Sequence, residues 1–99
     1  MSSDEIKSKV RACVAAMPQR AKVRKISLFG SHLHCTEKPE SDVDLLIELA
    51  EPVGYFELVR IQQMLSQSLG KEVDLVTPRA LSKYFRDEVL AEAMPLYEK

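Results

Sequence analysis

The sequence predicts an α/β (α+β) fold, in which a small β-sheet packs with helices. Three short apolar runs have the length and composition of strands. They alternate with longer stretches whose apolar residues recur at helical spacing. The chain has 99 residues, so we expect a single domain over residues 1–99. The predicted order is helix, strand, strand, helix, strand, helix.

The first two helices are marked by apolar periodicity and by clear stop signals. We expect the first from Ser2 to about Met17, before Pro18, because proline interrupts a helix. The second is expected from Tyr55 to Leu69, before Gly70. The side chains expected in the core from these helices are Ile6, Val10, Cys13, Val14, Met17, Tyr55, Leu58, Ile61, Met64, Leu65 and Leu69.

The third helix is predicted near the end of the chain. Thr77-Pro78 has the pattern of an N-cap followed by proline in the first turn. The helix is expected from Ala80 to about Ala93, with a short tail after Pro95. Its apolar positions place Leu81, Phe85 and Val89 on one face, which we expect to be buried.

The strands are expected at Val23–Phe29, from Asp42 to about Leu49, and at Glu72–Thr77. An apolar stretch ends at Gly30-Ser31. After ten intervening residues, Asp42 and Asp44 open the second strand. Since side chains alternate along a strand, these two carboxylates should point the same way. A divalent cation such as Mg²⁺ would offset their repulsion, because it prefers oxygen ligands.

The residues around this pair suggest phosphate chemistry. Gly30 lets a backbone turn approach a ligand closely, and Ser31 adds a hydroxyl donor. Asp74 is a third acid within an apolar run, where an unpartnered charge would be costly if buried. Three carboxylates and a phosphate-binding turn together predict metal-assisted phosphoryl or nucleotidyl transfer.

From about Val23 to the C-terminus the sequence resembles the DNA polymerase beta-type nucleotidyltransferases, and more narrowly the minimal nucleotidyltransferases called MNT. The resemblance rests on Gly30-Ser31, the spacing to Asp42-x-Asp44, and the later Asp74. It implies the nucleotidyltransferase fold, with a small mixed β-sheet that carries the acids on one side. It also implies two Mg²⁺ ions held by the aspartates Asp42, Asp44 and Asp74. Gly30 and Ser31 would then bind the nucleotide phosphates, and Asp74 could also act as a general base.

The resemblance also implies a function and a partner. An MNT protein transfers AMP from ATP to a hydroxyl and acts as the antitoxin of a HEPN-domain ribonuclease toxin, usually encoded beside it. One alternative is a module that neutralises its partner by contact alone. Another is transfer to a small molecule, although such enzymes carry a further domain for the acceptor. A homodimer or a hetero-oligomer is possible, whereas template-directed synthesis on nucleic acid is not expected from so short a chain.

The loop after Ser31 departs from the family pattern. Where relatives have Ala-Arg-Gly, this chain has His32-Leu33-His34-Cys35-Thr36. Either histidine could replace a phosphate donor, and zinc binding by His32, His34 and Cys35 is conceivable but lacks a second ligand cluster. Surface histidines are the simpler interpretation.

Composition constrains partners and location. The net charge is −1, so overall basicity does not indicate nucleic-acid binding. Seven Lys or Arg and no acid lie between Ile6 and Thr36. This basic stretch is interpreted as a solvated surface, or alternatively as a rim that attracts a polyphosphate or an acidic partner. Two cysteines do not make a disulfide framework, and no signal peptide or membrane-length run is present. We therefore expect a cytoplasmic protein.

Overall fold

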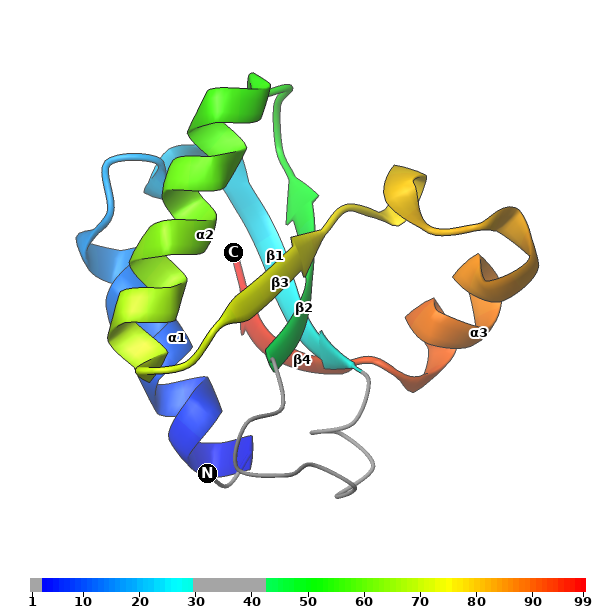
Figure 1. Ribbon diagram of the computed structural model, residues 1–99, viewed down its shortest axis with the longest axis horizontal. Helices are drawn as coiled ribbons and strands as arrows, with labels where there is room; N and C mark the ends of the chain where they lie inside the picture. The colour runs from blue at the N-terminus through cyan, green and yellow to red at the C-terminus, as the bar shows by residue number, and fades with distance from the viewer. Residues whose placement is uncertain (1–2, 30–42) are drawn as a thin grey trace.

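The computed structural model describes residues 3–29 and 43–99. Its elements, coloured along the chain in Figure 1, form a sheet with helices on either side. The helices are α1 (Ser3–Ala16), α2 (Tyr55–Leu69) and α3 (Lys83–Glu92), with short 3₁₀ turns η1 (Arg20–Lys22) and η2 (Pro78–Ala80). The strands are β1 (Val23–Phe29), β2 (Val43–Leu49), β3 (Val73–Val76) and β4 (Met94–Glu98).

The sheet is mixed, as the family resemblance implies. Its strand order is β3-β2-β1-β4. The strand β1 pairs antiparallel with both β2 and β4, whereas β2 and β3 are parallel. A parallel pair needs a crossover connection, which α2 supplies between β2 and β3.

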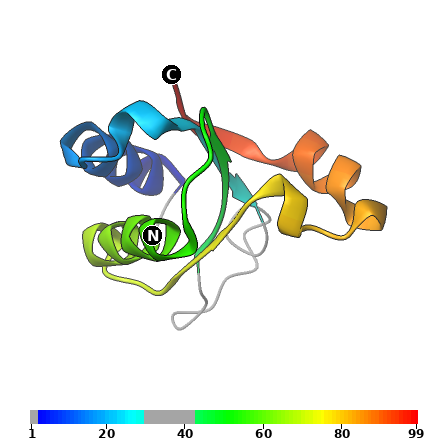
Figure 2. The same cartoon turned by 90° about the horizontal axis from the view of Figure 1, so that it is seen from above.

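The core lies between one face of this sheet and the helices α1 and α2. Figure 2 shows both helices on that side and α3 on the other. Alternate residues of β2, such as Val43, Leu45 and Ile47, are fully buried and point toward the two helices. The expected helix stripes are confirmed, since Ile6, Val10, Ile61 and Leu65 are also at most 1% exposed.

The end of the chain differs from the sequence prediction, because β4 replaces the expected helix end and tail. The predicted order of helix, strand, strand, helix, strand, helix therefore lacks the final strand. Leu96 is buried in this strand at 1% exposure, and the Arg11 Nε of α1 donates to its carbonyl at 2.9 Å. Pro95 ends the helix as expected and is tolerated here because β4 is an edge strand.

The prediction for the third helix is wrong in its start and in its burial. The 3₁₀ turn η2 ends at Ala80, and α3 begins only at Lys83. Ser82 is its N-cap and accepts from the Tyr84 N–H at 3.4 Å. No residue of α3 is buried. Phe85 is 61% exposed, and on α2 Tyr55 is 75% exposed, so neither aromatic belongs to the core.

Candidate active site

Two of the predicted acids, Asp44 and Asp74, lie side by side on neighbouring strands. They are register partners in the parallel pair of β2 and β3, so their Cα atoms are about 4.8 Å apart. On its other side Asp44 is the partner of Phe29, the last residue of β1. The three side chains form a row across the sheet at the start of β2.

Both carboxylates leave the sheet on the face opposite α1 and α2. Val43 and Leu45 flank Asp44 and are buried against the two helices. Val73 and Leu75 flank Asp74 in the same way. Because side chains alternate along a strand, Asp44 and Asp74 must both point to the second face. Asp44 is half-buried there and Asp74 is exposed.

The position of Asp74 depends on α2 as well as on β2. The strand β3 lies at the edge of the sheet, so one row of its backbone N–H groups needs partners outside the sheet. Ser66 Oγ accepts from the Val73 N–H at 3.0 Å. Gln62 Oε1 accepts from the Leu75 N–H at 3.4 Å. These bonds hold the backbone on both sides of Asp74.

The pair has the chemistry of a cation ligand set. Two like charges on neighbouring strands repel each other, and the exposure of Asp74 screens part of this repulsion. A hard divalent cation relieves this repulsion and accepts carboxylate oxygens. Within residues 3–29 and 43–99, no cluster of three or more His, Cys, Asp or Glu could hold a metal. Asp44 and Asp74 supply two carboxylates, which are the type of ligand that a hard divalent cation prefers.

The other predicted site residues lie outside the described part of the chain. These are Gly30, Ser31 and Asp42, together with the His32, His34 and Cys35 of the neighbouring loop. Their predicted roles in phosphate and metal binding stay predictions. The described flanks are Phe29, which directly precedes Gly30, and Val43, which directly follows Asp42.

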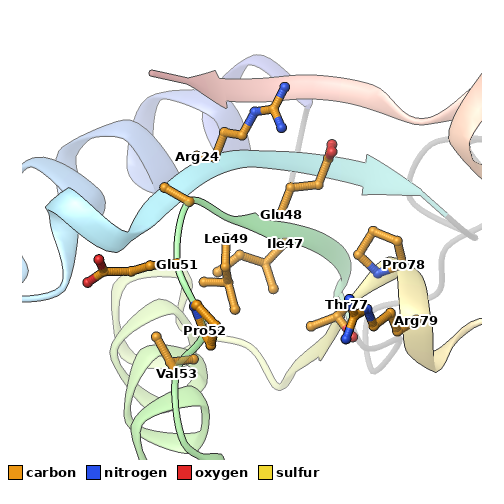
Figure 3. A pocket seen from close by; sticks show the side chains of 11 residues that line it. Arg24, Ile47, Glu48, Leu49, Glu51, Pro52, Val53, Thr77, Pro78 and Arg79 are labelled. Carbon is orange, nitrogen blue, oxygen red and sulfur yellow. The ribbon is translucent and has the colours of Figure 1, made fainter.

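A cavity of about 500 Å³ opens at the opposite end of β2 (Figure 3). It exists because β3 stops pairing at Val76, opposite Leu46, while β2 continues to Leu49. Arg24 and Glu48 lie on one side, and Thr77 and Arg79 on the other. Neither Asp44 nor Asp74 lines it, so the cavity is separate from the acid pair.

Sequence reasoning missed this cavity and the exposure of α3. The cavity depends on where a strand stops pairing, which no local pattern shows. The exposure of α3 had one signal in the sequence. Five of its ten residues are charged, which is a high share for a helix expected to bury a face.

The family model for polymerase beta nucleotidyltransferases matches residues 12–99. The chain belongs to this nucleotidyltransferase family. The match spans both acids and all four strands. It confirms the family resemblance identified in the sequence, and with it the nucleotidyltransferase fold that the resemblance implies.

Curated relatives extend over almost the whole chain. The chain is 34% identical over 94 residues to a presumed protein adenylyltransferase of Methanocaldococcus jannaschii, covering 95% of this chain and 97% of the relative. It is 31% identical over 94 residues to the protein adenylyltransferase MntA of Thermococcus cleftensis, covering 95% of each. The predicted class of minimal nucleotidyltransferase is thereby confirmed.

A solved structure of a toxin–antitoxin with AMP-PNP has the same fold. It superimposes with a TM-score of 0.75 at 26% identity, over 94% of this chain and 73% of that chain.

The structure describes residues 3–29 and 43–99, and no helix in these residues is long and apolar enough to cross a membrane.

Proposed function

We propose that this nucleotidyltransferase transfers AMP from ATP to a hydroxyl group on a partner protein. The observation that carries the proposal is the in-register pair of Asp44 and Asp74 on one face of the sheet. Relatives covering nearly the whole chain are named protein adenylyltransferases, which supports a protein acceptor over a small molecule.

The reaction joins the acceptor oxygen to the α-phosphorus of ATP. The bond from that phosphorus to the bridging oxygen breaks, and pyrophosphate leaves with its electron pair. Asp74 is exposed beside Asp44, and its carboxylate takes the proton of the acceptor hydroxyl. Gly30 and Ser31 bind the triphosphate through N–H and hydroxyl donors, as the sequence predicts.

Two magnesium ions belong to this proposal. Asp42, Asp44 and Asp74 would hold them, because a carboxylate set of this kind fits a hard divalent cation. Bound magnesium supplies positive charge that offsets the negative charge developing on the phosphates. The carboxylates fix the position of that charge relative to the acceptor hydroxyl.

The proposed partner is a HEPN-domain toxin encoded beside this chain, for which this protein is the antitoxin. The family resemblance points to it, and a relative of the same fold was solved as a toxin–antitoxin. The cytoplasmic location expected from the sequence stays a prediction.

The test is to incubate the purified chain, ATP and Mg²⁺ with the purified HEPN protein and to measure the partner's intact mass. We expect the mass to rise by one or more AMP units and the toxin's ribonuclease activity to fall. An unchanged mass would refute transfer to this partner, provided that the Thermococcus cleftensis MntA modifies its own partner under the same conditions.

Neutralisation by contact alone is a second candidate function, because α3 exposes apolar side chains that packing does not use. A double variant, Asp44→Asn with Asp74→Asn, separates the two functions. Loss of silencing in that variant supports transfer, whereas full silencing supports contact.

A further inference from the structure

The outer edge of β3 is covered by two polar side chains of α2. The strand has four residues and lies at the edge of the sheet, so one row of its backbone N–H groups points away from β2. Ser66 Oγ accepts from the Val73 N–H at 3.0 Å, and Gln62 Oε1 accepts from the Leu75 N–H at 3.4 Å. Both acceptors belong to half-buried residues. The strand is thus hydrogen-bonded to β2 on one edge and to α2 on the other.

The spacing of the two acceptors matches the spacing of the two donors. Gln62 and Ser66 are one turn apart on the same side of α2, which separates them by about 6 Å along the helix axis. Val73 and Leu75 are alternate residues of β3, which separates them by about 6.6 Å along the strand. The earlier helix residue bonds to the later strand residue, so the helix and the strand run in opposite directions. The two side chains therefore stand in for a neighbouring strand.

Asp74 lies between the two donor residues. Its side chain is exposed, so packing does not fix it, and a single methylene group joins the carboxylate to the backbone. The position of this carboxylate relative to Asp44, its register partner, therefore follows the position of the β3 backbone. A misplacement of about 1 Å in a reacting group can lower a rate by about 100-fold. The rate of transfer should thus depend on how firmly β3 is held.

We infer that Gln62 and Ser66 are positioning residues for AMP transfer, and that they act through the β3 backbone to hold Asp74 beside Asp44. The inference rests on the proposed function, in which Asp74 acts on the acceptor hydroxyl. Neither positioning residue touches the reacting atoms, because α2 covers the face of the sheet opposite the two acids (Figure 2).

The test is steady-state kinetics of AMP transfer from ATP to the purified HEPN protein, with the full chain and the variants Ser66→Ala and Gln62→Met. Alanine removes only the hydroxyl, and methionine keeps the length of glutamine without its acceptor. We expect kcat to fall about tenfold or more for Ser66→Ala, and severalfold for Gln62→Met, whose bond is longer. The KM for ATP should change by less than about twofold, because Gly30 and Ser31 are the residues proposed to bind the triphosphate.

Amide hydrogen exchange of the free chain, followed by NMR, gives a second readout that does not depend on activity. We expect exchange at Val73 to speed up by about tenfold or more in Ser66→Ala, and exchange at Leu75 to speed up in Gln62→Met. The amides of β1 should exchange as in the unmodified chain, since β1 pairs with β2 and β4 and not with β3.

Conservative variants test whether the acceptor atom is what matters. Ser66→Thr keeps a hydroxyl, and Gln62→Glu keeps an oxygen at the same distance from the backbone, so both should retain a kcat close to that of the unmodified chain. Gln63→Ala and Ser68→Ala are matched controls on the same helix. Their side chains are exposed, and we expect them to leave both kcat and exchange unchanged.

A control for general loss of stability is Val14→Ala. Val14 is fully buried on α1, which packs against α2 and β4. We expect this variant to lower the melting temperature at least as much as Ser66→Ala. Its kcat should remain normal at a temperature where both variants are folded.

Two results would overturn the inference. An unchanged kcat in Ser66→Ala and Gln62→Met would leave protection of the strand edge as the role of the two side chains. An equal fall of kcat in Val14→Ala would attribute the effect to stability alone. Failure of the proposed function looks different, because the unmodified chain would then transfer no AMP. In that case unchanged exchange at Val73 and Leu75 in the variants would still refute a hold on β3.

Discussion

Asp44 and Asp74 occupy the same register position on two parallel strands, although thirty residues of sequence separate them. The crossover helix between them does more than connect the strands. Its Ser66 and Gln62 side chains accept from the backbone N–H groups on either side of Asp74. The relative position of the two acids is thus determined by β2 on one side of β3 and by α2 on the other.

Replacing Asp74 with asparagine should abolish AMP transfer while leaving the fold intact. The change removes a charge but little volume, and the side chain is exposed, so we expect the free energy of unfolding to change by less than about 0.5 kcal/mol. Transfer should fall by about 100-fold or more, as for loss of a general base. Asp4→Asn, an exposed acid on α1, is the control and should retain full activity. Normal transfer by Asp74→Asn would remove this acid from the reaction.

Two leucines on different helices should differ sharply in their contribution to stability. Leu65 on α2 is fully buried, whereas Leu90 on α3 is 40% exposed. We expect Leu65→Ala to lower the free energy of unfolding by about 2–5 kcal/mol. Leu90→Ala should lower it by less than about 1 kcal/mol. Urea unfolding of both variants measures the difference, and equal losses would show that α3 is packed in solution.

The final strand should be needed for stability. Leu96 is 1% exposed and belongs to the core, and its carbonyl accepts from Arg11 of α1. We expect Leu96→Ala to lower the free energy of unfolding by about 2–5 kcal/mol. Glu98→Ala is a suitable control on the same strand, because its exposed carboxylate lies 3.9 Å from Lys25 Nζ, and such a long ion pair near the surface is worth little. A negligible effect of Leu96→Ala in thermal unfolding would contradict the pairing of β4 with β1.

The two described glycines should respond differently to alanine. Gly70 ends α2 with φ 69°, which an L-residue adopts at a cost of about 1 kcal/mol. Nothing crowds its Cβ position within 4 Å, so this backbone cost should be the whole effect of Gly70→Ala. Gly54 is the N-cap of α2 with φ −71°, which alanine adopts without strain. Gly54→Ala loses the preference for glycine at an N-cap, which the lower unfolded-state entropy of alanine offsets, so the free energy of unfolding should change by less than about 0.5 kcal/mol. Chemical denaturation of the pair tests the left-handed conformation directly.

The amino-acid sequence by itself determined the elements that local patterns specify. The strand Val23–Phe29 and the helix Tyr55–Leu69 have the predicted bounds, because the apolar spacing, Gly70 and the turn residues act within a few positions. The nucleotidyltransferase resemblance could also be identified, since Gly30, Ser31, Asp42 and Asp44 have a characteristic spacing.

Only the tertiary structure decided which distant residues meet. The pairing of Asp44 with Asp74 depends on the register of β2 and β3. Local pattern treats Met94–Glu98 as a helix end and a tail, whereas long-range pairing with β1 makes it a strand. The same limit explains Phe85 and Val89, whose helical spacing predicts a buried stripe. Periodicity specifies which side of a helix is apolar, but burial requires a neighbouring element, and the sheet and α2 leave α3 without one.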